Sequence, residues 1–230
     1  MTISIIFFDA DGTLWDFEKV LHYALGQTLA ELRRRVPGPR TEELSTSDLD
    51  TMRAQVASKR RGQGLTHEQI RQEAFERTLA ILGRPDPQLA AYLTEFYLHH
   101  RFTHIEMYPD VLPALGQLKT RYRLGLISNG NTYPERCGLP NTFDVVVFAH
   151  DHSVRKPSPR LYEIALGQAG VTPGQAVHVG DSLLNDIVGA QAAGIYATWL
   201  NRYQQRNTTE IRPDAEIASL IELPAMLARL

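Results

Sequence analysis

The chain alternates between short apolar runs and segments whose apolar residues recur at helical spacing. Five runs are apolar without alternation: residues 3–8, 124–127, 145–148, 176–179 and 195–200. Such runs, rich in Val and Ile, are typical of strands covered on both faces of a parallel sheet. Between them apolar residues repeat as in a helix, as Val111, Leu115 and Leu118 do. This order predicts an α/β fold with a doubly wound, Rossmann-like parallel sheet, and residues 215–230 are apolar enough to add a final strand or helix.

One region interrupts the alternation. From about Phe17 to Arg101 the apolar spacing is helical and no strand pattern occurs. We therefore expect an all-helical subdomain, residues 17–104, inserted into an α/β core that consists of residues 1–16 and 105–230. A single larger core is the alternative interpretation.

Composition and charge narrow the class of protein without naming a function. The 230 residues, 43% of them hydrophobic and 22% charged, suffice for a buried core. A net charge of -2 favours neither nucleic acid nor an anionic membrane as partner, and the single cysteine, Cys137, excludes an intrachain disulfide framework. No stretch approaches the roughly 18 apolar residues of a membrane helix, and the N-terminus lacks the features of a secretory signal. We expect a cytoplasmic protein; the sequence leaves its oligomeric state open.

Polar residues follow four of the predicted strands. They are Asp9 and Asp11 after the first strand, Ser128 and Asn129 of Ser-Asn-Gly after the second, Lys156 after the third, and Asp181 and Asp186 after the fourth. Because ligands of such sheets bind beyond the carboxyl ends of the strands, we expect these side chains to converge. Each stretch alone also fits a plain turn, a helix approach or a helix N-cap. Their joint occurrence in this order favours a functional site.

The chemistry of these residues suits phosphoryl transfer. Carboxylates gathered in one cleft repel one another and call for a cation, and oxygen ligands beside a substrate phosphate favour Mg²⁺. Asp9 can act as the nucleophile that forms an aspartyl-phosphate, and Asp11, on the same side of an extended backbone, as the general acid and base. Ser128, the amide of Asn129 and the ammonium group of Lys156 can bind phosphate oxygens.

These stretches resemble the four motifs of the haloacid dehalogenase-like (HAD) superfamily. The likeness lies in "DADGT", "SNG", the Lys of "RKP" and "GDSLLND", and covers about residues 1–16 and 105–200. It implies that Mg²⁺ is held by the Asp9 side chain, the Asp11 main-chain carbonyl and Asp181. It also implies that the helical insert is a cap.

The same resemblance assigns the remaining roles. Asp9 is the implied nucleophile and Asp11 the implied general acid and base. Asp186 would reach the metal through water or orient Lys156, and Ser128 and Lys156 would bind the phosphate.

Asp11 indicates which branch of the superfamily is involved. Members that cleave carbon–halogen bonds resemble this core but lack the second acid of the first motif, since only a phosphate ester needs a protonated leaving group. The stretch "GDSLLNDIVGAQAAGIYATWLNR" is also similar to a branch that contains nucleoside 5′-monophosphate and sugar-phosphate phosphatases. The resemblance thus implies a Mg²⁺-dependent phosphomonoesterase that acts on a small phosphorylated metabolite.

Two other functions are compatible with parts of the sequence. A signalling receiver also phosphorylates a strand-end Asp beside an acid pair and a Lys, but it is one small domain without a helical insert. A binding protein could keep the fold without activity, although it would have no need of every chemical group. Trp15 and Phe17, at the junction with the helical segment, are expected to be packed aromatics, with stacking on a substrate as the alternative.

Overall fold

The structure is a computed structural model that describes residues 2–230, and the chain divides into two compact units. The sheet unit consists of Met1–Asp16 and Glu106–Leu230, and the helical unit consists of Phe17–Ile105. Each unit has a hydrophobic core of its own.

The sheet unit contains a six-stranded sheet with the strand order β3-β2-β1-β4-β5-β6, and every neighbouring pair is parallel. The strands are β1 (Ile5–Phe8), β2 (Arg123–Ser128), β3 (Val145–Phe148), β4 (Ala176–Gly180), β5 (Tyr196–Leu200) and β6 (Ala215–Ile217). All four side chains of β1 are fully buried, as expected for a strand covered on both faces. The predicted doubly wound α/β fold is confirmed.

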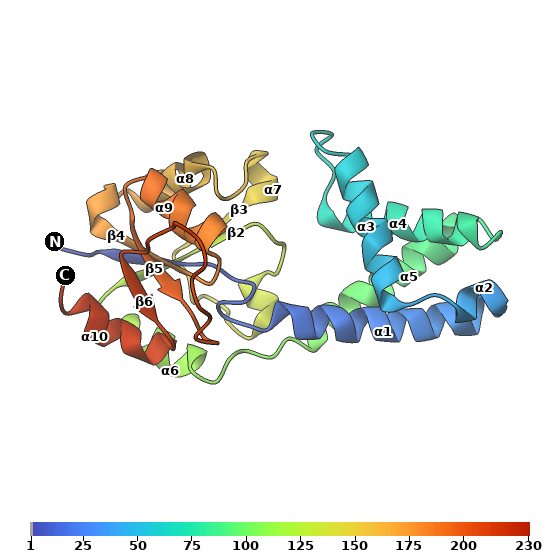
Figure 1. Cartoon of the computed structure of the whole chain (residues 1–230), viewed down its shortest axis with the longest axis horizontal. Coiled ribbons are helices and arrows are strands. Elements are labelled where there is room, and N and C mark those ends of the chain that lie inside the picture. The colour runs from blue at the N-terminus through green and yellow to red at the C-terminus, as the bar shows by residue number, and fades with distance from the viewer. Residues whose placement is uncertain (1) are drawn as a thin grey trace. The chain divides into compact units, whose positions relative to one another are not determined.

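Helices cover both faces of this sheet. Figure 1 shows α8 (Pro159–Ala169) and α9 (Gly189–Ala192) on one side, and α6 (Val111–Leu118) and α10 (Leu223–Leu227) on the other. Shorter segments are α7 (Ala149–His152), the 3₁₀ turns η1 (Pro134–Cys137), η2 (Pro173–Gln175) and η4 (Leu220–Glu222), and a π-helix, η3 (Leu183–Val188). The final segment therefore supplies both a strand, β6, and a helix, α10.

The order of the strands fixes where a site can form. The chain runs from β1 to β2 and β3 on one side, then returns to place β4 on the other side of β1. Crossovers therefore leave in opposite directions beside β1, and such a switch point leaves a crevice at the carboxyl ends of the strands. The loops after β1, β2 and β4 all begin at that edge.

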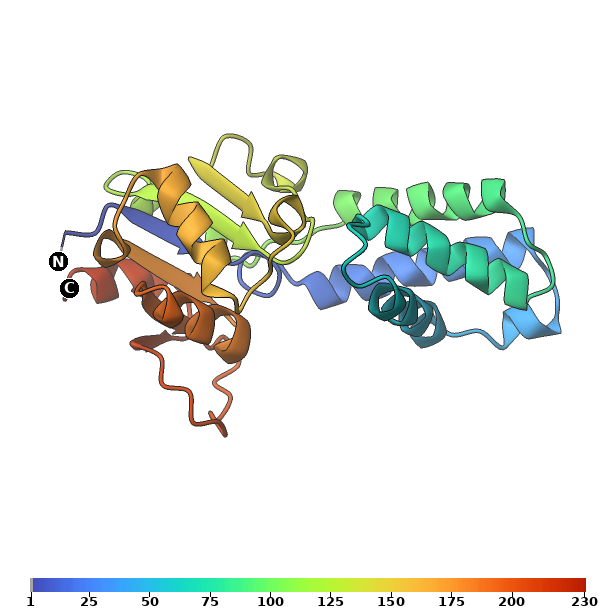
Figure 2. The same ribbon diagram turned by 90° about the horizontal axis from the view of Figure 1, so that it is seen from above.

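The helical unit contains α1 (Phe17–Arg35), α2 (Pro39–Glu42), α3 (Thr46–Lys59), α4 (His67–Ile81) and α5 (Pro87–Thr103). α1 packs on α5 and α3, and α4 packs on α3 and α5, so the helices lie side by side (Figure 2). Side-chain caps at Ser45, Thr66 and Asp86 start three of them. No helix within residues 2–230 is long and apolar enough to cross a membrane.

Candidate active site

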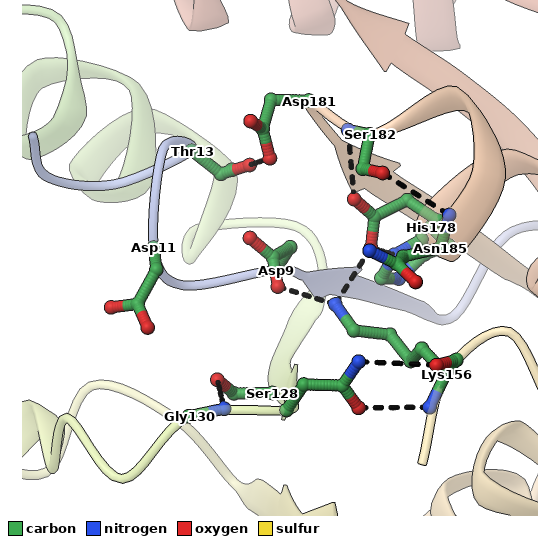
Figure 3. Close-up of polar contacts among 12 residues, drawn as sticks. Asp9, Asp11, Thr13, Ser128, Gly130, Lys156, His178, Asp181, Ser182 and Asn185 are labelled. Carbon is green, nitrogen blue, oxygen red and sulfur yellow. Dashed lines mark hydrogen bonds and ion pairs between the residues drawn. The ribbon is translucent and has the colours of Figure 1, made fainter. Parts of the chain in front are cut away.

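Three charged side chains form a buried network at the carboxyl edge of the sheet (Figure 3). Asp9 follows β1, Lys156 lies in the loop after α7, and Asp186 lies on η3. The exposed fractions of these residues are only 6%, 2% and 1%. The Lys156 ammonium group donates hydrogen bonds to Oδ1 of Asp9 and, at 2.7 Å, to Oδ1 of Asp186. Because buried charges are unfavourable unless paired, these contacts are what allow all three groups to sit in the interior.

The network holds its two carboxyl groups in different electrostatic states. Burial raises the pKa of Asp9 well above its ordinary range, and the charge of Lys156 offsets only part of that increase. Burial acts on the pKa of Asp186 in the same direction, but Lys156 and a hydrogen bond with His178 outweigh it and lower that pKa. Asp186 is therefore the carboxylate that stably carries its charge beside Lys156, whereas ionised Asp9 calls for further positive charge.

Asp181 completes a group of three acids. One carboxylate oxygen from each of Asp9, Asp181 and Asp186 lies within 4.8 Å of the others. Packing around its carboxyl group and the charge of Asp186 raise the pKa of Asp181 to about 6, although the residue is exposed. Three carboxylates face one ammonium group, so two negative charges are left over when all are ionised. This oxygen-only donor set fits a hard divalent cation such as Mg²⁺.

Local backbone structure aims Asp186 at Lys156. The hydroxyl of Ser182 caps η3 by accepting from the Asn185 N–H at 3.1 Å, and the Ser182 N–H donates to Oδ2 of Asp186 at 3.0 Å. His178 of β4 is fully buried, and its Nε2 lies 3.1 Å from Oδ1 of Asp186. Burial lowers the pKa of His178, which favours the neutral ring. Because an ionised carboxylate only accepts hydrogen bonds, we assign the ring hydrogen to Nε2, which donates it to Asp186.

The Ser-Asn-Gly turn after β2 holds the main chain of Lys156. The Asn129 side chain exchanges two hydrogen bonds with the main chain of Lys156: its amide donates to the carbonyl at 3.1 Å and its oxygen accepts from the N–H at 2.8 Å. Asn129 thus positions Lys156, and its own main-chain N–H is the group that can serve a phosphate. Ser128 is buried, and its hydroxyl accepts from the Gly130 N–H at 3.0 Å.

The loop after β1 turns sharply at Gly12. This residue has a φ of 89°, in the left-handed region, and a Cβ atom there would stand 2.5 Å from Oδ2 of Asp181. The next residue, Thr13, directs its hydroxyl toward Oδ1 of Asp181 at 3.4 Å. Glycine at position 12 therefore lets the first and fourth motifs approach each other.

Asp11 lies apart from the three acids. Its carboxylate is turned away from Asp181 (Figure 3), and its Oδ1 accepts hydrogen bonds from Trp15 and Thr132. The assumption of extended backbone after β1 does not hold, because the Leu14 N–H donates to the carbonyl of Ala10 at 2.8 Å and closes a turn. Trp15 is fully buried, which confirms the prediction of a packed aromatic. Asp11 therefore has its own partners, separate from the Lys156 network.

Three contributors were not predicted from the sequence. His178 lies within a run interpreted as apolar, Trp15 was expected to pack or to stack on a substrate rather than to bind Asp11, and Thr132 lies beyond the Ser-Asn-Gly turn. A histidine in a strand buried on both faces is itself a usable signal, since such a side chain needs a hydrogen-bond partner.

Comparison with known proteins gives a consistent result. The family model for haloacid dehalogenase-like hydrolases matches residues 3–194. A glyceraldehyde 3-phosphate phosphatase of Methanopyrus kandleri is 30% identical, over 94% of this chain and 93% of that protein. An N-acylneuraminate-9-phosphatase of Mus musculus is 31% identical over 68% of this chain, which spans 65% of the mouse protein.

A solved structure is similar over the whole chain. It is described as a 2-haloacid dehalogenase from Pseudomonas syringae, is 32% identical, covers 99% of both chains and superimposes with a TM-score of 0.84. The family predicted from the motifs is thus confirmed by sequence and by structure. The chain belongs to the haloacid dehalogenase-like hydrolases.

Proposed function

We propose that the protein is a Mg²⁺-dependent phosphomonoesterase that hydrolyses a small phosphorylated metabolite, such as a nucleoside 5′-monophosphate or a sugar phosphate. The observation that carries this proposal is the pairing of buried Asp9 with Lys156, next to a second acid, Asp11, that has separate partners. The first group suits a nucleophile, and the second suits proton transfer.

Four residues would hold the cation. They are Asp9 and Asp181 through their side chains, Asp11 through its main-chain carbonyl, and Asp186 either directly or through water. When bound, Mg²⁺ supplies positive charge that neutralises these carboxylates and polarises a phosphoryl oxygen.

The residues of the chain account for both halves of the reaction. A carboxylate oxygen of Asp9 forms a bond to phosphorus while the bond from phosphorus to the ester oxygen breaks. The Asp11 carboxyl group gives its proton to that departing oxygen. In the second half Asp11 takes a proton from water, whose oxygen bonds to phosphorus as the bond from phosphorus to Asp9 breaks. Ser128 and Lys156 hold the phosphoryl oxygens in both halves.

The relatives support the substrate class. The Methanopyrus kandleri and Mus musculus proteins are both named for small phosphorylated metabolites. We assign the helical unit the role of a cap that selects the leaving group of the ester. Its composition of helices alone, with a separate core, suits an insert that varies while the sheet unit keeps the chemistry.

Hydrolytic cleavage of a carbon–halogen bond is the second candidate. It is favoured by the similarity to the Pseudomonas syringae structure. Asp11 argues against it, because a halide leaves without a proton and such chemistry has no use for a hydrogen-bonded acid at this position.

The test is a hydrolysis screen with and without Mg²⁺. The panel contains p-nitrophenyl phosphate, phosphorylated metabolites and a 2-haloacid, and is run for the unmodified protein and for Asp9→Asn. We expect Mg²⁺-dependent phosphate release that Asp9→Asn abolishes with its circular dichroism spectrum unchanged. Halide release without phosphate release would establish the second candidate, and release of neither would indicate a binding protein.

A further inference from the structure

We propose that Trp15 and Thr132 are positioning residues that fix the carboxyl group of Asp11 and determine which of its oxygens handles the proton. This inference rests on the proposed function and deepens it. It is carried by two hydrogen bonds to one oxygen atom and by the space around the other.

Both hydrogen bonds end on Oδ1 of Asp11. The indole Nε1 of Trp15 donates to it at 2.7 Å, and the hydroxyl of Thr132 donates to it at 3.0 Å. Trp15 and Thr132 are each fully buried, so neither donor can be replaced by bulk water without a change in packing. Two donors from separate loops hold the plane of the carboxyl group, as is required of a group that transfers a proton at one place.

Oδ2 lies beside the Ser-Asn-Gly turn, to which we assign phosphate binding. A Cβ atom added at Gly130 would collide with Oδ2 of Asp11 and would stand 3.4 Å from the hydroxyl of Ser128. Both oxygens therefore border the same point on the Ser-Asn-Gly turn. Since Oδ1 already accepts two hydrogen bonds, Oδ2 is the oxygen that can carry a proton toward the ester and collect one from water.

The indole nitrogen is the feature that distinguishes position 15. Its ring is buried in the sheet unit, where residue 15 also bridges to Met107. Any large apolar residue would satisfy that packing, whereas only a donor can hold Asp11. Loss of the N–H should therefore affect the proton step selectively.

The experiment compares two phosphate esters in each variant. p-Nitrophenyl phosphate releases a weakly basic phenolate that needs little protonation, whereas an alkyl phosphate releases a strongly basic alkoxide that needs a proton. The measured quantity is the ratio of kcat/KM for the alkyl ester to kcat/KM for the aryl ester, because kcat/KM reports the first half of the reaction and excludes the base step that both esters share. This ratio does not depend on the fraction of folded enzyme.

Trp15→Phe keeps an aromatic ring and removes the N–H. We expect kcat/KM for the alkyl phosphate to fall about tenfold, the scale of one hydrogen bond to a carboxylate, while kcat/KM for p-nitrophenyl phosphate changes by less than about twofold. Asp11→Asn sets the upper limit, with a loss of roughly a hundredfold or more for the alkyl ester. Trp199→Phe is the matched control, because it also removes an indole N–H, but one that donates to the Asp181 carbonyl at 2.9 Å and not to Asp11. Any effect of this substitution should fall equally on both esters and leave the ratio unchanged.

Thr132 provides a second and independent variant. Thr132→Val should lower the ratio as Trp15→Phe does, and Thr132→Ser, which keeps a hydroxyl, should restore it. An unchanged ratio in both Trp15→Phe and Thr132→Val, in an enzyme that hydrolyses both esters, would overturn this inference alone. Absence of phosphate release from either ester by the unmodified protein would overturn the proposed function, and this inference with it.

Discussion

Two clusters of charged side chains in this molecule differ in their exposure to solvent. Around Lys156 in the sheet unit, the charges are buried and the carboxyl groups have strongly displaced pKa values. Around Glu31 on α1 of the helical unit, one carboxylate accepts from Arg34, Arg35 and Tyr92 with both arginine side chains open to solvent. The cluster around Lys156 forms at a large cost in desolvation free energy, whereas the cluster around Glu31 forms with little desolvation.

The difference indicates where function lies. Exposed ion pairs contribute modestly to stability and are common on protein surfaces. A buried network offers no advantage in stability over apolar residues of similar volume, so its presence needs another explanation. In the sheet unit that explanation is the chemistry proposed for Asp9, and the helical unit shows no comparable buried carboxylate network within residues 17–105.

The largest effect is expected from Lys156→Met. The substitution leaves Asp9 and Asp186 buried without their shared cation, and breaking a buried pair costs about 3–5 kcal/mol. Urea unfolding in the presence of a chelator measures the free energy of unfolding without help from a bound metal.

Lys119→Met is the matched control for that variant. Lys119 is exposed and donates to the carbonyl of Asn141 at 2.7 Å, so its replacement should change the free energy of unfolding by less than about 0.5 kcal/mol. Equal effects of the two substitutions on the free energy of unfolding would show that the buried carboxyl groups of Asp9 and Asp186 do not depend on Lys156 for their stability.

A smaller effect is expected from Glu31→Gln. Hydrogen bonds from Arg34, at 2.8 Å and 2.7 Å, are the main reason that the pKa of Glu31 falls from its ordinary 4.5 to about 2. The Glu31 side chain is only 10% exposed, but its arginine partners are solvated, so we expect a loss of about 1 kcal/mol at pH 7. Glu163→Gln, at an ion pair exposed on both sides, should have no measurable effect.

The stabilisation by Glu31 should also depend on pH. A carboxylate whose pKa is lowered in the folded state adds stability above its unfolded pKa and loses it as the pH falls. The difference between the parent protein and Glu31→Gln should therefore be constant above about pH 5, decline as the pH falls from 4.5 toward about 2, and vanish only below about pH 2. A difference of undiminished size at about pH 2 would mean that packing, rather than charge, stabilises this contact.

Much of the sheet unit could be predicted from the sequence because its strands are buried on both faces. Such strands appear as uninterrupted apolar runs, and their carboxyl ends must converge, which located Asp9, Lys156 and Asp186. β6 gave a weaker pattern, since only Ile217 of its three residues is buried. The apolar pattern of α3 was equally weak, because Leu49 and Val56 are its only buried residues.

The atomic contacts of Asp186 and Asp11 could not be predicted from the sequence, because they depend on tertiary structure. The π-helix that carries Asp186 depends on tertiary contacts, among them the Tyr162 hydroxyl that donates to the Asn185 carbonyl at 2.9 Å. Of the two partners of Asp11, Trp15 is supplied by the turn at Gly12 and Thr132 by the loop after β2, and no spacing rule specifies either contact. Spacing along the chain thus indicates which residues meet, while tertiary contacts decide which atoms touch.

The proposed reaction requires that Asp9 accept the phosphoryl group. The most direct test is to quench the enzyme in acid during turnover of p-nitrophenyl phosphate with Mg²⁺, reduce it with borohydride, which converts an aspartyl-phosphate to homoserine, and sequence the peptides by mass spectrometry. We expect homoserine at position 9 only, and none in Asp9→Asn or without substrate. Steady phosphate release with position 9 unmodified, or with another carboxylate reduced instead, would contradict the proposed reaction.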